Sequence, residues 1–422
     1  MTVLVQASKQ NARSGDLSGK IVAYRAADPV ATTELMFKVW ERGGVFSPVD
    51  PKIPDSPGAT SSAVFDGSLG MGAQVLTGPA PPFGPGLIVR TSGSTGLPKG
   101  VYLTLDAITA SAESTLKFYG IGGQDRFLVS LPMHHVGGLM IPWRARLAGA
   151  QCLIAAKPQG LSAAIIHHKP SIVSVVPTQL MDLIKEGSSL SQLARMKVIL
   201  CGGAASSTLL WHEVNRLGLP VSFCYGMTET CSQIAATVPG TSSSFGSYAL
   251  LGHAVVATAE GRIKVKSRSI ADGYWQDDSL ISCVDADGWF HSEDLGHLEQ
   301  SSDRLVILGR ADEIFKCGGE KISPSEILGS LAEEQLQIDN FAVAPLPHSR
   351  LQQVPVMVVW SEAIPAVDAI MTRLQEVLPR FKCPRAIFWA RASQMPPMFK
   401  PTSRAALAAI SEGARLVWGE VE

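Results

Sequence analysis

The sequence predicts an α/β protein in two parts: a large N-terminal domain of layered sheets and helices, and a small α+β domain at the C-terminus. Between residues 125 and 225, short apolar strands alternate with helical segments, which is typical of a mostly parallel sheet covered by helices. Residues 262–310 change to short β segments, and a smaller mixture of helices and strands follows Arg310. This change of pattern places the boundary between the two parts near Arg310.

The composition is that of a globular protein with more than one core. The chain has 422 residues, 46% of them hydrophobic, and a net charge of −1. This length suggests two or three domains, and a near-neutral chain is a poor partner for nucleic acid or a charged membrane surface. Its seven cysteines include no C-x-x-C pair, so we expect reduced, mostly buried thiols and a cytoplasmic location. We expect no signal peptide, because the apolar run at residues 1–6 is too short. We expect no membrane helix, because no uncharged apolar run reaches about 18 residues.

The N-terminal segment begins with one clear helix. Residues 32–42 place four apolar side chains on one helical face, and two glycines end the pattern. Residues 45–49 are apolar and form the next predicted strand. The following stretch, up to residue 85, is rich in Pro, Gly and Ser, which predicts loops.

A glycine-rich loop between two predicted strands, 87–89 and 101–104, is the strongest functional signal. Residues 90–100 contain three glycines, four hydroxyl side chains and one lysine. Glycines let backbone N–H groups approach an anion, and hydroxyls and a lysine add further donors. An ordinary Gly/Ser hairpin turn needs far fewer donors. We therefore predict a polyphosphate site, whose residues are Thr91, Ser92, Gly93, Ser94, Thr95, Gly96 and Lys99.

A Walker A loop is the obvious alternative for this stretch, and the residues exclude it. That motif places Ser or Thr directly after its lysine and opens a helix. Here Pro98 precedes Lys99, Gly100 follows it, and a β-rich segment comes next.

The alternating region supplies the rest of the predicted large domain. A glycine pair, Gly202–Gly203, follows one of its strands and would lie at the carboxyl edge of the sheet, where ligands bind in α/β folds. The predicted helices are 106–118, 139–147, 162–168 and 177–186, and the predicted strands are 125–131, 152–155, 172–176, 197–201 and 221–225.

Two further segments carry side chains suited to a nucleotide. After the strand at 221–225, the Tyr225 ring can stack on a base, Thr228 can bind phosphate, and Glu229 can hold a divalent cation through oxygen. In residues 287–296, Asp294 can accept hydrogen bonds from two vicinal hydroxyls. Taken alone, the first segment could be a turn with a helix N-cap, and Asp294 could be a capping or turn residue.

The paired histidines do not predict a metal site. Adjacent residues of a strand face opposite sides, so His134 and His135 should not share an ion. They lack an accompanying cluster of Cys or carboxylates. The pair at 167–168 ends a predicted helix and is expected to be structural.

Together, the loop at 90–101 and the segments 225–230, 287–296, 308–326 and 395–401 closely resemble the ATP motifs of the adenylate-forming superfamily. The resemblance implies ATP, Mg²⁺ and coenzyme A as ligands, with Glu229 holding the metal. It implies catalytic roles for Lys99, Glu229 and Lys400. Lys400 follows Phe399, where the superfamily usually has glycine, and on its own it would be a solvated surface lysine. The remaining implied ATP-binding residues are Gly202, Gly203, Tyr225, Gly226, Met227, Thr228, Asp294 and Arg310.

The resemblance also implies how the two parts cooperate. It places an N-terminal domain at 1–309, a hinge at 310–312 centred on Asp312, and a mobile C-terminal domain at 313–422. In the first half-reaction a carboxylate attacks the α-phosphorus of ATP, and in the second the small domain rotates and the CoA thiol attacks the acyl-AMP. Gly318 and Gly319 would then lie beside the pantetheine of CoA.

The acyl-side segments, 131–139, 174–180 and 225–234, are most similar to the o-succinylbenzoate–CoA ligase family of menaquinone biosynthesis. This similarity implies that His135, Arg144 and Thr178 bind an aromatic carboxylate. Arg144 in a surface salt bridge is the alternative, since most arginines are exposed. An enzyme that loads a carrier protein and a catalytically silent nucleotide-binding relative are the other functions left open. A homodimer is one option for the assembly.

Overall fold

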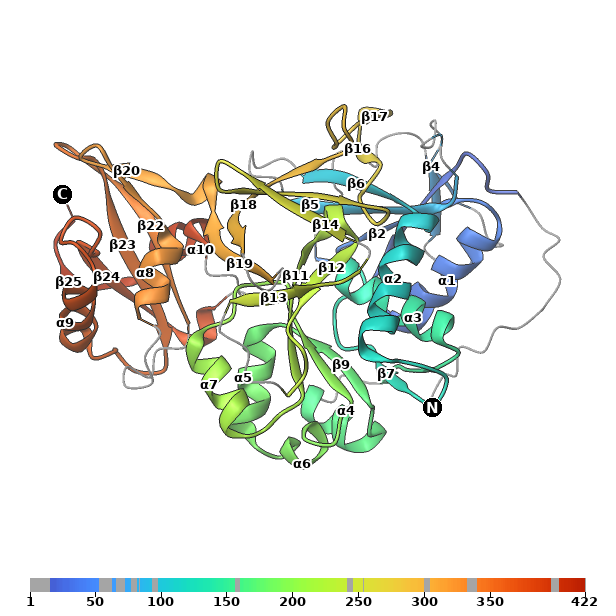
Figure 1. Ribbon diagram of the computed structural model, residues 1–422, viewed down its shortest axis with the longest axis horizontal. Coiled ribbons are helices and arrows are strands. Elements are labelled where there is room, and N and C mark those ends of the chain that lie inside the picture. The colour runs from blue at the N-terminus through green and yellow to red at the C-terminus, as the bar shows by residue number, and fades with distance from the viewer. Residues whose placement is uncertain are drawn as a thin grey trace.

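The computed structural model describes most of the chain (Figure 1). Two large sheets, a two-stranded hairpin and a four-stranded sheet form its framework, with helices packed against them. This arrangement confirms the predicted α/β class. The described residues are 16–52, 63–65, 73–76, 82, 84–92, 98–155, 160–240, 246–252, 254–299, 304–331, 340–395 and 402–421.

The first large sheet has eight strands and carries the two arms of the glycine-rich loop. Its central strands β1, β2 and β5 are parallel, and β5 pairs with the antiparallel strand β6. In order across the sheet the strands are β17 (Ser279–Ile281), β16 (Gly273–Gln276), β6 (Pro98–Thr104), β5 (Gly86–Ser92), β2 (Val45–Val49), β1 (Ile21–Arg25), β4 (Ala73–Leu76) and β3 (Ala63–Phe65).

Three helices share a core with this sheet: α1 (Pro29–Glu41), α2 (Leu105–Tyr119) and α3 (Val136–Ala148). Each begins or ends where the sequence offers a cap. The Asp28 carboxylate accepts hydrogen bonds from two N–H groups in the first turn of α1. Gly120 and Gly149 take the left-handed conformation that ends α2 and α3.

The second large sheet has eleven strands and two halves. Strands β7 to β11 form the parallel half that the alternating pattern predicts, and β12 to β15, β18 and β19 continue it in antiparallel pairs. Across the sheet the order is β14 (Ala254–Ala259), β15 (Arg262–Ser267), β18 (Phe290–Leu298), β19 (Arg304–Arg310), β13 (Ser247–Leu250), β12 (Ser232–Ala236), β11 (Val221–Met227), β10 (Val198–Cys201), β9 (Ile172–Val175), β7 (Arg126–Leu128) and β8 (Gln151–Leu153).

Four helices accompany the parallel half and bury their apolar faces against it. Pro177 opens α5 and Gly187 ends it in the left-handed conformation, so this helix begins and ends where the sequence predicts. The four are α4 (Leu161–His168), α5 (Pro177–Glu186), α6 (Leu190–Leu193) and α7 (Thr208–Arg216).

Two local predictions are wrong. Residues 63–65 and 73–76, in a stretch expected to form loops, are the strands β3 and β4. The strand expected over 125–131 ends at Leu128, and residues 131–135 form a bend and turn before α3. His134 and His135 therefore do not alternate across a strand; their ring centroids lie 4.3 Å apart. Among the described residues no group of three or more His, Cys, Asp or Glu could hold a metal ion.

The C-terminal part has its own four-stranded sheet, in the order β22-β23-β24-β25. Its apolar cores contain described residues from position 315 onwards, whereas the cores of the preceding part end at Ile307. This separation agrees with a boundary near 310–312, and the limits themselves stay a prediction. The elements are β20 (Phe315–Cys317), β21 (Glu320–Ile322), α8 (Pro324–Ser330), β22 (Asn340–His348), β23 (Gln352–Ser361), α9 (Val367–Val377), β24 (Ala386–Arg391), α10 (Ser403–Ser411) and β25 (Arg415–Gly419).

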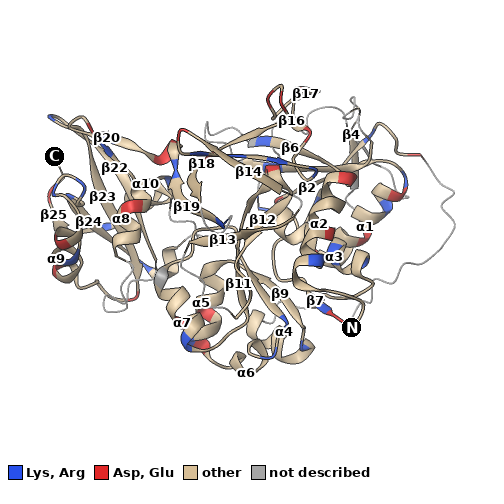
Figure 2. Cartoon of the chain, in the orientation of Figure 1, with Lys and Arg blue, Asp and Glu red and all other residues tan. Residues whose placement is uncertain are grey.

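The surface chemistry agrees with the near-neutral composition. Lys and Arg are interspersed with Asp and Glu over both parts of the chain (Figure 2). All seven cysteines lie in described residues and are free, and five of them are buried, as expected. Among the helices of the described residues, none combines the length and apolarity needed to cross a membrane.

Candidate active site

The two arms of the glycine-rich loop are joined in register. Thr91 lies opposite Lys99, and Ser92 lies opposite Pro98, so β5 and β6 hold the ends of the loop together. The tip of the loop, with Gly93, Ser94, Thr95 and Gly96, is outside the described residues, as is Lys400. The roles predicted for these five residues therefore stay predictions.

Lys99 is held close to an aromatic ring. Its Nζ lies 5.1 Å from the centroid of the Tyr274 ring, close enough for a cation–π interaction. No described residue forms an ion pair with Lys99, which leaves its charge available for a polyphosphate.

The segment between β11 and β12 is a tight turn that presents Thr228 and Glu229. Gly226 is required there, because a Cβ at this position would lie 2.0 Å from the Ser232 carbonyl oxygen. The Thr230 hydroxyl bridges the turn: it accepts from the Met227 N–H at 2.9 Å and lies 2.7 Å from the Ser232 carbonyl oxygen. The next two residues, Cys231 and Ser232, have φ values of +52° and +89°. These contacts fix the backbone that carries the predicted phosphate and metal ligands.

Glu229 fits a magnesium ion that arrives with a nucleotide. Mg²⁺ in nucleotide sites is usually held by one or two carboxylates, phosphate oxygens and waters. Glu229 supplies one carboxylate, and the Tyr274 hydroxyl donates to its Oε1 at 3.1 Å. A single protein carboxylate needs the phosphates to complete the coordination, which is the arrangement expected for a Mg–ATP site.

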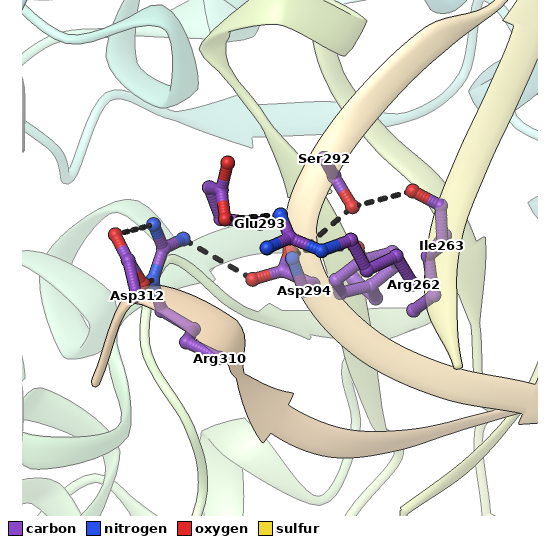
Figure 3. Close-up of polar contacts among 8 residues, drawn as sticks. Arg262, Ile263, Ser292, Glu293, Asp294, Arg310 and Asp312 are labelled. Carbon is purple, nitrogen blue, oxygen red and sulfur yellow. Dashed lines mark hydrogen bonds and ion pairs between the residues drawn. The ribbon is translucent and has the colours of Figure 1, made fainter. Parts of the chain in front are cut away.

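Asp294 on β18 is the centre of a hydrogen-bonded group that includes Arg310 at the end of β19 (Figure 3). Its Oδ2 accepts from the Tyr225 hydroxyl at 2.7 Å, and its Oδ1 accepts from Arg310 Nη1 at 3.1 Å. Arg310 also donates to both oxygens of Asp312, at 2.9 and 2.7 Å. Each oxygen of Asp294 keeps one lone pair, so the carboxylate can still accept from two ribose hydroxyls. Ser292, two residues earlier, donates to the Ile263 carbonyl and anchors the strand.

Burial and the hydrogen bonds within this group have opposite effects on the pKa of Asp294. Burial raises the pKa of Asp294 above its usual value, and the bonds from Tyr225 and Arg310 act against that rise. Burial and the neighbouring Asp294 raise the pKa of Tyr225 well above its usual value, so it stays a hydrogen-bond donor at neutral pH. The Asp312 carboxylate raises the pKa of Arg310. Arg310 therefore stays cationic beside Asp294 and Asp312.

Arg144 is buried on α3, with 2% of its surface exposed, so the surface salt bridge that the sequence left open is wrong. Its Nη2 donates to the Ser232 hydroxyl at 3.1 Å, and its Nε has no hydrogen-bond partner among the described residues. Among the described residues no carboxylate forms an ion pair with it. Ser232 follows the Thr228–Glu229 turn directly, so the guanidinium lies beside the predicted nucleotide motif.

The other two predicted acyl-side residues sit at helix N-termini. His135 is the N-cap of α3 and is exposed, and Thr178 is partly exposed in the first turn of α5. Nine residues separate His135 from Arg144, so their backbones lie about 13 Å apart along the helix axis.

Four of the predicted glycines, Gly202, Gly203, Gly318 and Gly319, lie where the chain leaves a strand. Gly202 and Gly203 follow β10 directly, and the Gly202 N–H donates to the Val175 carbonyl. Gly318 and Gly319 form the tip of the β20–β21 hairpin, with φ values of +57° and +94°. A Cβ at Gly319 would meet nothing within 4 Å, so the tip is open on that side.

Two side chains contact the predicted site residues without having been assigned a role from the sequence: Tyr274, which contacts Lys99 and Glu229, and Ser232, which contacts Arg144. Tyr274 is 45 residues from Glu229 in the chain, and only the pairing of β16 with β6 brings it to the glycine-rich loop. The sequence carries no spacing signal for such a contact.

Comparisons with known proteins agree with this geometry. The model of the AMP-binding enzyme family matches residues 55–275. The chain is 34% identical over 297 residues to the 2-succinylbenzoate--CoA ligase of Salmonella typhimurium, covering 70% of this chain and 62% of that protein. It is 33% identical over 320 residues to the ligase of the same name from Haemophilus influenzae, covering 74% and 68%. The chain spans less than two thirds of the Salmonella protein and of its Escherichia coli counterpart, of which it covers 57%.

Solved structures with the same fold are similar over more of the chain. A variant of E. coli MenE with bound OSB-AMS has a TM-score of 0.76 and 26% identity, covering 94% of this chain and 88% of that one. The Bacillus subtilis O-succinylbenzoate coenzyme A synthetase in complex with AMP has a TM-score of 0.65 and 27% identity, covering 79% and 70%.

Proposed function

The chain belongs to the AMP-binding enzyme family, and from this premise we propose that it is an ATP-dependent acid–CoA ligase. Its proposed reaction converts o-succinylbenzoate to o-succinylbenzoyl-CoA through an acyl-AMP intermediate. The nucleotide half of the proposal is supported by the Tyr225–Asp294–Arg310 group and by Glu229 beside the glycine-rich loop. The related ligases of Salmonella and Haemophilus carry this activity in their names.

The single observation that carries the substrate proposal is the buried Arg144. A buried guanidinium is costly unless an anion or several acceptors compensate it. Within the described part of the chain, one serine hydroxyl is its hydrogen-bond acceptor, and Nε is left without a partner. Burial lowers the pKa of Arg144, but from a value so high that the group stays charged at neutral pH. A substrate carboxylate would supply the missing acceptor.

o-Succinylbenzoate provides that carboxylate and a second one to react. Its aliphatic carboxylate would be adenylated, and its ring carboxylate would bind Arg144. Ser232, the hydrogen-bond partner of Arg144, follows the turn that carries Thr228 and Glu229. The proposed site for the ring carboxylate therefore lies close to the proposed nucleotide site. His135 and Thr178 remain proposed neighbours of the acyl group.

The residues of the chain then have distinct roles. In the first step an oxygen of the aliphatic carboxylate bonds to the α-phosphorus, and pyrophosphate leaves. Lys99 and the N–H groups of the loop would bind the phosphates, and Lys400 would neutralise charge at the carboxylate and α-phosphate. Mg²⁺ on Glu229 would supply charge neutralisation when bound. In the second step the CoA sulfur bonds to the acyl carbon, AMP leaves, and Gly318–Gly319 would border the thiol.

Pyrophosphate release with a panel of carboxylic acids tests the proposal. We expect o-succinylbenzoate to give the highest kcat/KM, with pyrophosphate formed from ATP and a thioester formed on addition of CoA. A carrier-loading enzyme would release pyrophosphate without making a CoA thioester. A silent relative would bind nucleotide and release none.

A further inference from the structure

Tyr274 lies between two oppositely charged groups of the proposed ATP site. Its hydroxyl donates to Glu229 Oε1 at 3.1 Å, and Lys99 Nζ lies 5.1 Å from the centroid of its ring. No ion pair joins Lys99 to Glu229, although both belong to the described residues and both contact the same tyrosine. The tyrosine therefore contacts both charges while they stay apart.

The strand pairing explains why Tyr274 reaches both groups. Tyr274 on β16 lies opposite Val101 on β6, and Lys99 is two residues before Val101. Side chains two residues apart on a strand share one face, so Tyr274 and Lys99 are diagonal neighbours on the same face. The ring also packs against the core under this sheet, where Val101 is fully buried. Packing on one side and pairing on the other leave the ring little freedom to move.

Glu229 is held by this strand through its backbone as well. The Ala271 N–H donates to the Glu229 carbonyl oxygen at 2.8 Å, three residues before the tyrosine. The neighbouring Asp272 N–H donates to the Tyr102 carbonyl of β6 at 3.1 Å. The segment 271–274 thus connects the metal-binding turn to the strand that carries Lys99, and Tyr274 completes the connection at the level of side chains.

We propose that Tyr274 is a positioning residue for Mg–ATP: its hydroxyl orients the Glu229 carboxylate, and its ring keeps that carboxylate apart from Lys99. This inference depends on the proposed function only through the use of Mg–ATP. A direct Lys99–Glu229 ion pair would have to break before phosphate and metal could bind. The hydroxyl occupies one oxygen of Glu229 and leaves the other free for the ion. The aromatic face attracts the lysine ammonium without neutralising it.

The experiment measures Mg²⁺ and ATP binding directly, by calorimetry of the full chain. Tyr274→Phe keeps the ring and removes the hydroxyl, so we expect the apparent Mg²⁺ dissociation constant in the presence of ATP to rise roughly tenfold, as for loss of one hydrogen bond to a charged group. Tyr274→Ala also removes the ring, so Lys99 can pair with Glu229, and we expect ATP binding to weaken further, beyond the phenylalanine variant. The KM for the acid should stay within about twofold of wild type, because Arg144 is untouched.

Tyr102→Phe is the matched control. Tyr102 lies opposite Gly273 on the adjacent strand, is fully buried, and donates to the Gly84 carbonyl at 2.8 Å. Loss of the Tyr102 hydroxyl removes a similar hydrogen bond from the same sheet and leaves Lys99 and Glu229 unchanged. Mg²⁺ and ATP binding should therefore be unchanged.

A double-mutant cycle with Glu229→Ala tests whether the tyrosine acts through the glutamate. If it does, Tyr274→Phe has no further effect on Mg²⁺ binding in the Glu229→Ala background. Additive effects, or wild-type Mg²⁺ binding in Tyr274→Phe, would overturn the role of the hydroxyl. Equal ATP binding by the alanine and phenylalanine variants would overturn the role of the ring. Because these readouts need no acyl substrate, failure to activate o-succinylbenzoate would contradict the proposed function and leave this test intact.

Discussion

At the scale of single residues, Arg144 should determine which acid is accepted. If its guanidinium binds the ring carboxylate, Arg144→Ala should lose about 2–5 kcal/mol of selectivity for o-succinylbenzoate over a benzoyl-propionate without that carboxylate. ATP affinity should be little changed. The measurement is the ratio of kcat/KM values for the two acids in the variant and in wild type.

Arg146→Ala is the control for this prediction. Arg146 is on the same helix, but its side chain is 30% exposed, pairs with Glu41 at 2.9 Å and lies over the Phe37 ring. Its removal should leave the selectivity ratio unchanged. Identical discrimination by Arg144→Ala and wild type would remove Arg144 from the acyl site.

Substitution of Lys99 should impair the use of ATP and should not impair the binding of the acid. Lys99→Ala removes the cation that faces the predicted polyphosphate, and Thr95→Ala removes a hydroxyl donor of the same loop. We expect each variant to raise the KM for ATP or to lower kcat, measured as pyrophosphate release at saturating acid. Wild-type Mg–ATP kinetics in both variants would show that this loop does not bind the phosphates.

At the scale of elements, His134 connects the end of β2 to the turn before α3. Its Nε2 lies 3.6 Å from Asp50 Oδ2, and its Nδ1 is buried with no hydrogen-bond partner in the residues that the structure describes. Burial lowers the pKa of His134 below its usual value, and the Asp50 carboxylate only partly offsets this. The folded protein therefore binds fewer protons than the unfolded chain between the lowered pKa and about 6.5.

The sign of the pH effect follows from that difference. Stability from neutral His134 is fully present above pH of about 6.5 and is lost as the pH falls through the lowered pKa. We expect His134→Phe to lose less stability than wild type between pH 7.5 and 5.5, measured by urea unfolding at both values. Parallel losses in the two proteins would contradict a buried neutral histidine.

Local signals decide how well each element could be predicted from the sequence. α5 begins and ends where expected because Pro177 and Gly187 mark its ends. β3 and β4 were missed because a segment rich in Pro, Gly and Ser has little apolar periodicity. β7 is shorter than predicted because the apolar run continues into the bend before α3.

Local signals also decide how well each site residue could be predicted from the sequence. The phosphate loop, the Glu229 turn and Asp294 lie in short motifs, so their residue types could be read from contiguous sequence. The contacts of Tyr274 with Glu229 and of Ser232 with Arg144 join residues 45 and 88 positions apart. The first contact depends on the pairing of β16 with β6, and the second on the packing of α3 against β12. A single sequence reveals neither.

At the scale of the whole molecule, the two parts should divide the two half-reactions. Lys400→Ala should abolish adenylation and spare thioester formation from supplied acyl-AMP, because the role proposed for the lysine is confined to the first step. Gly319→Trp should do the reverse, because the bulky ring would fill the open side of the β20–β21 hairpin where pantetheine is expected. Equal loss of both steps in each variant, measured separately, would reject alternation of the small domain.

The most direct measurement is identification of the products that the full chain makes from o-succinylbenzoate, ATP and CoA. Mass spectrometry without CoA should find o-succinylbenzoyl-AMP, with one pyrophosphate released for each. On addition of CoA, o-succinylbenzoyl-CoA and AMP should appear in equal amounts. Formation of ADP and phosphate, or an acyl-AMP that CoA does not consume, would contradict the assignment as an AMP-forming acid–CoA ligase.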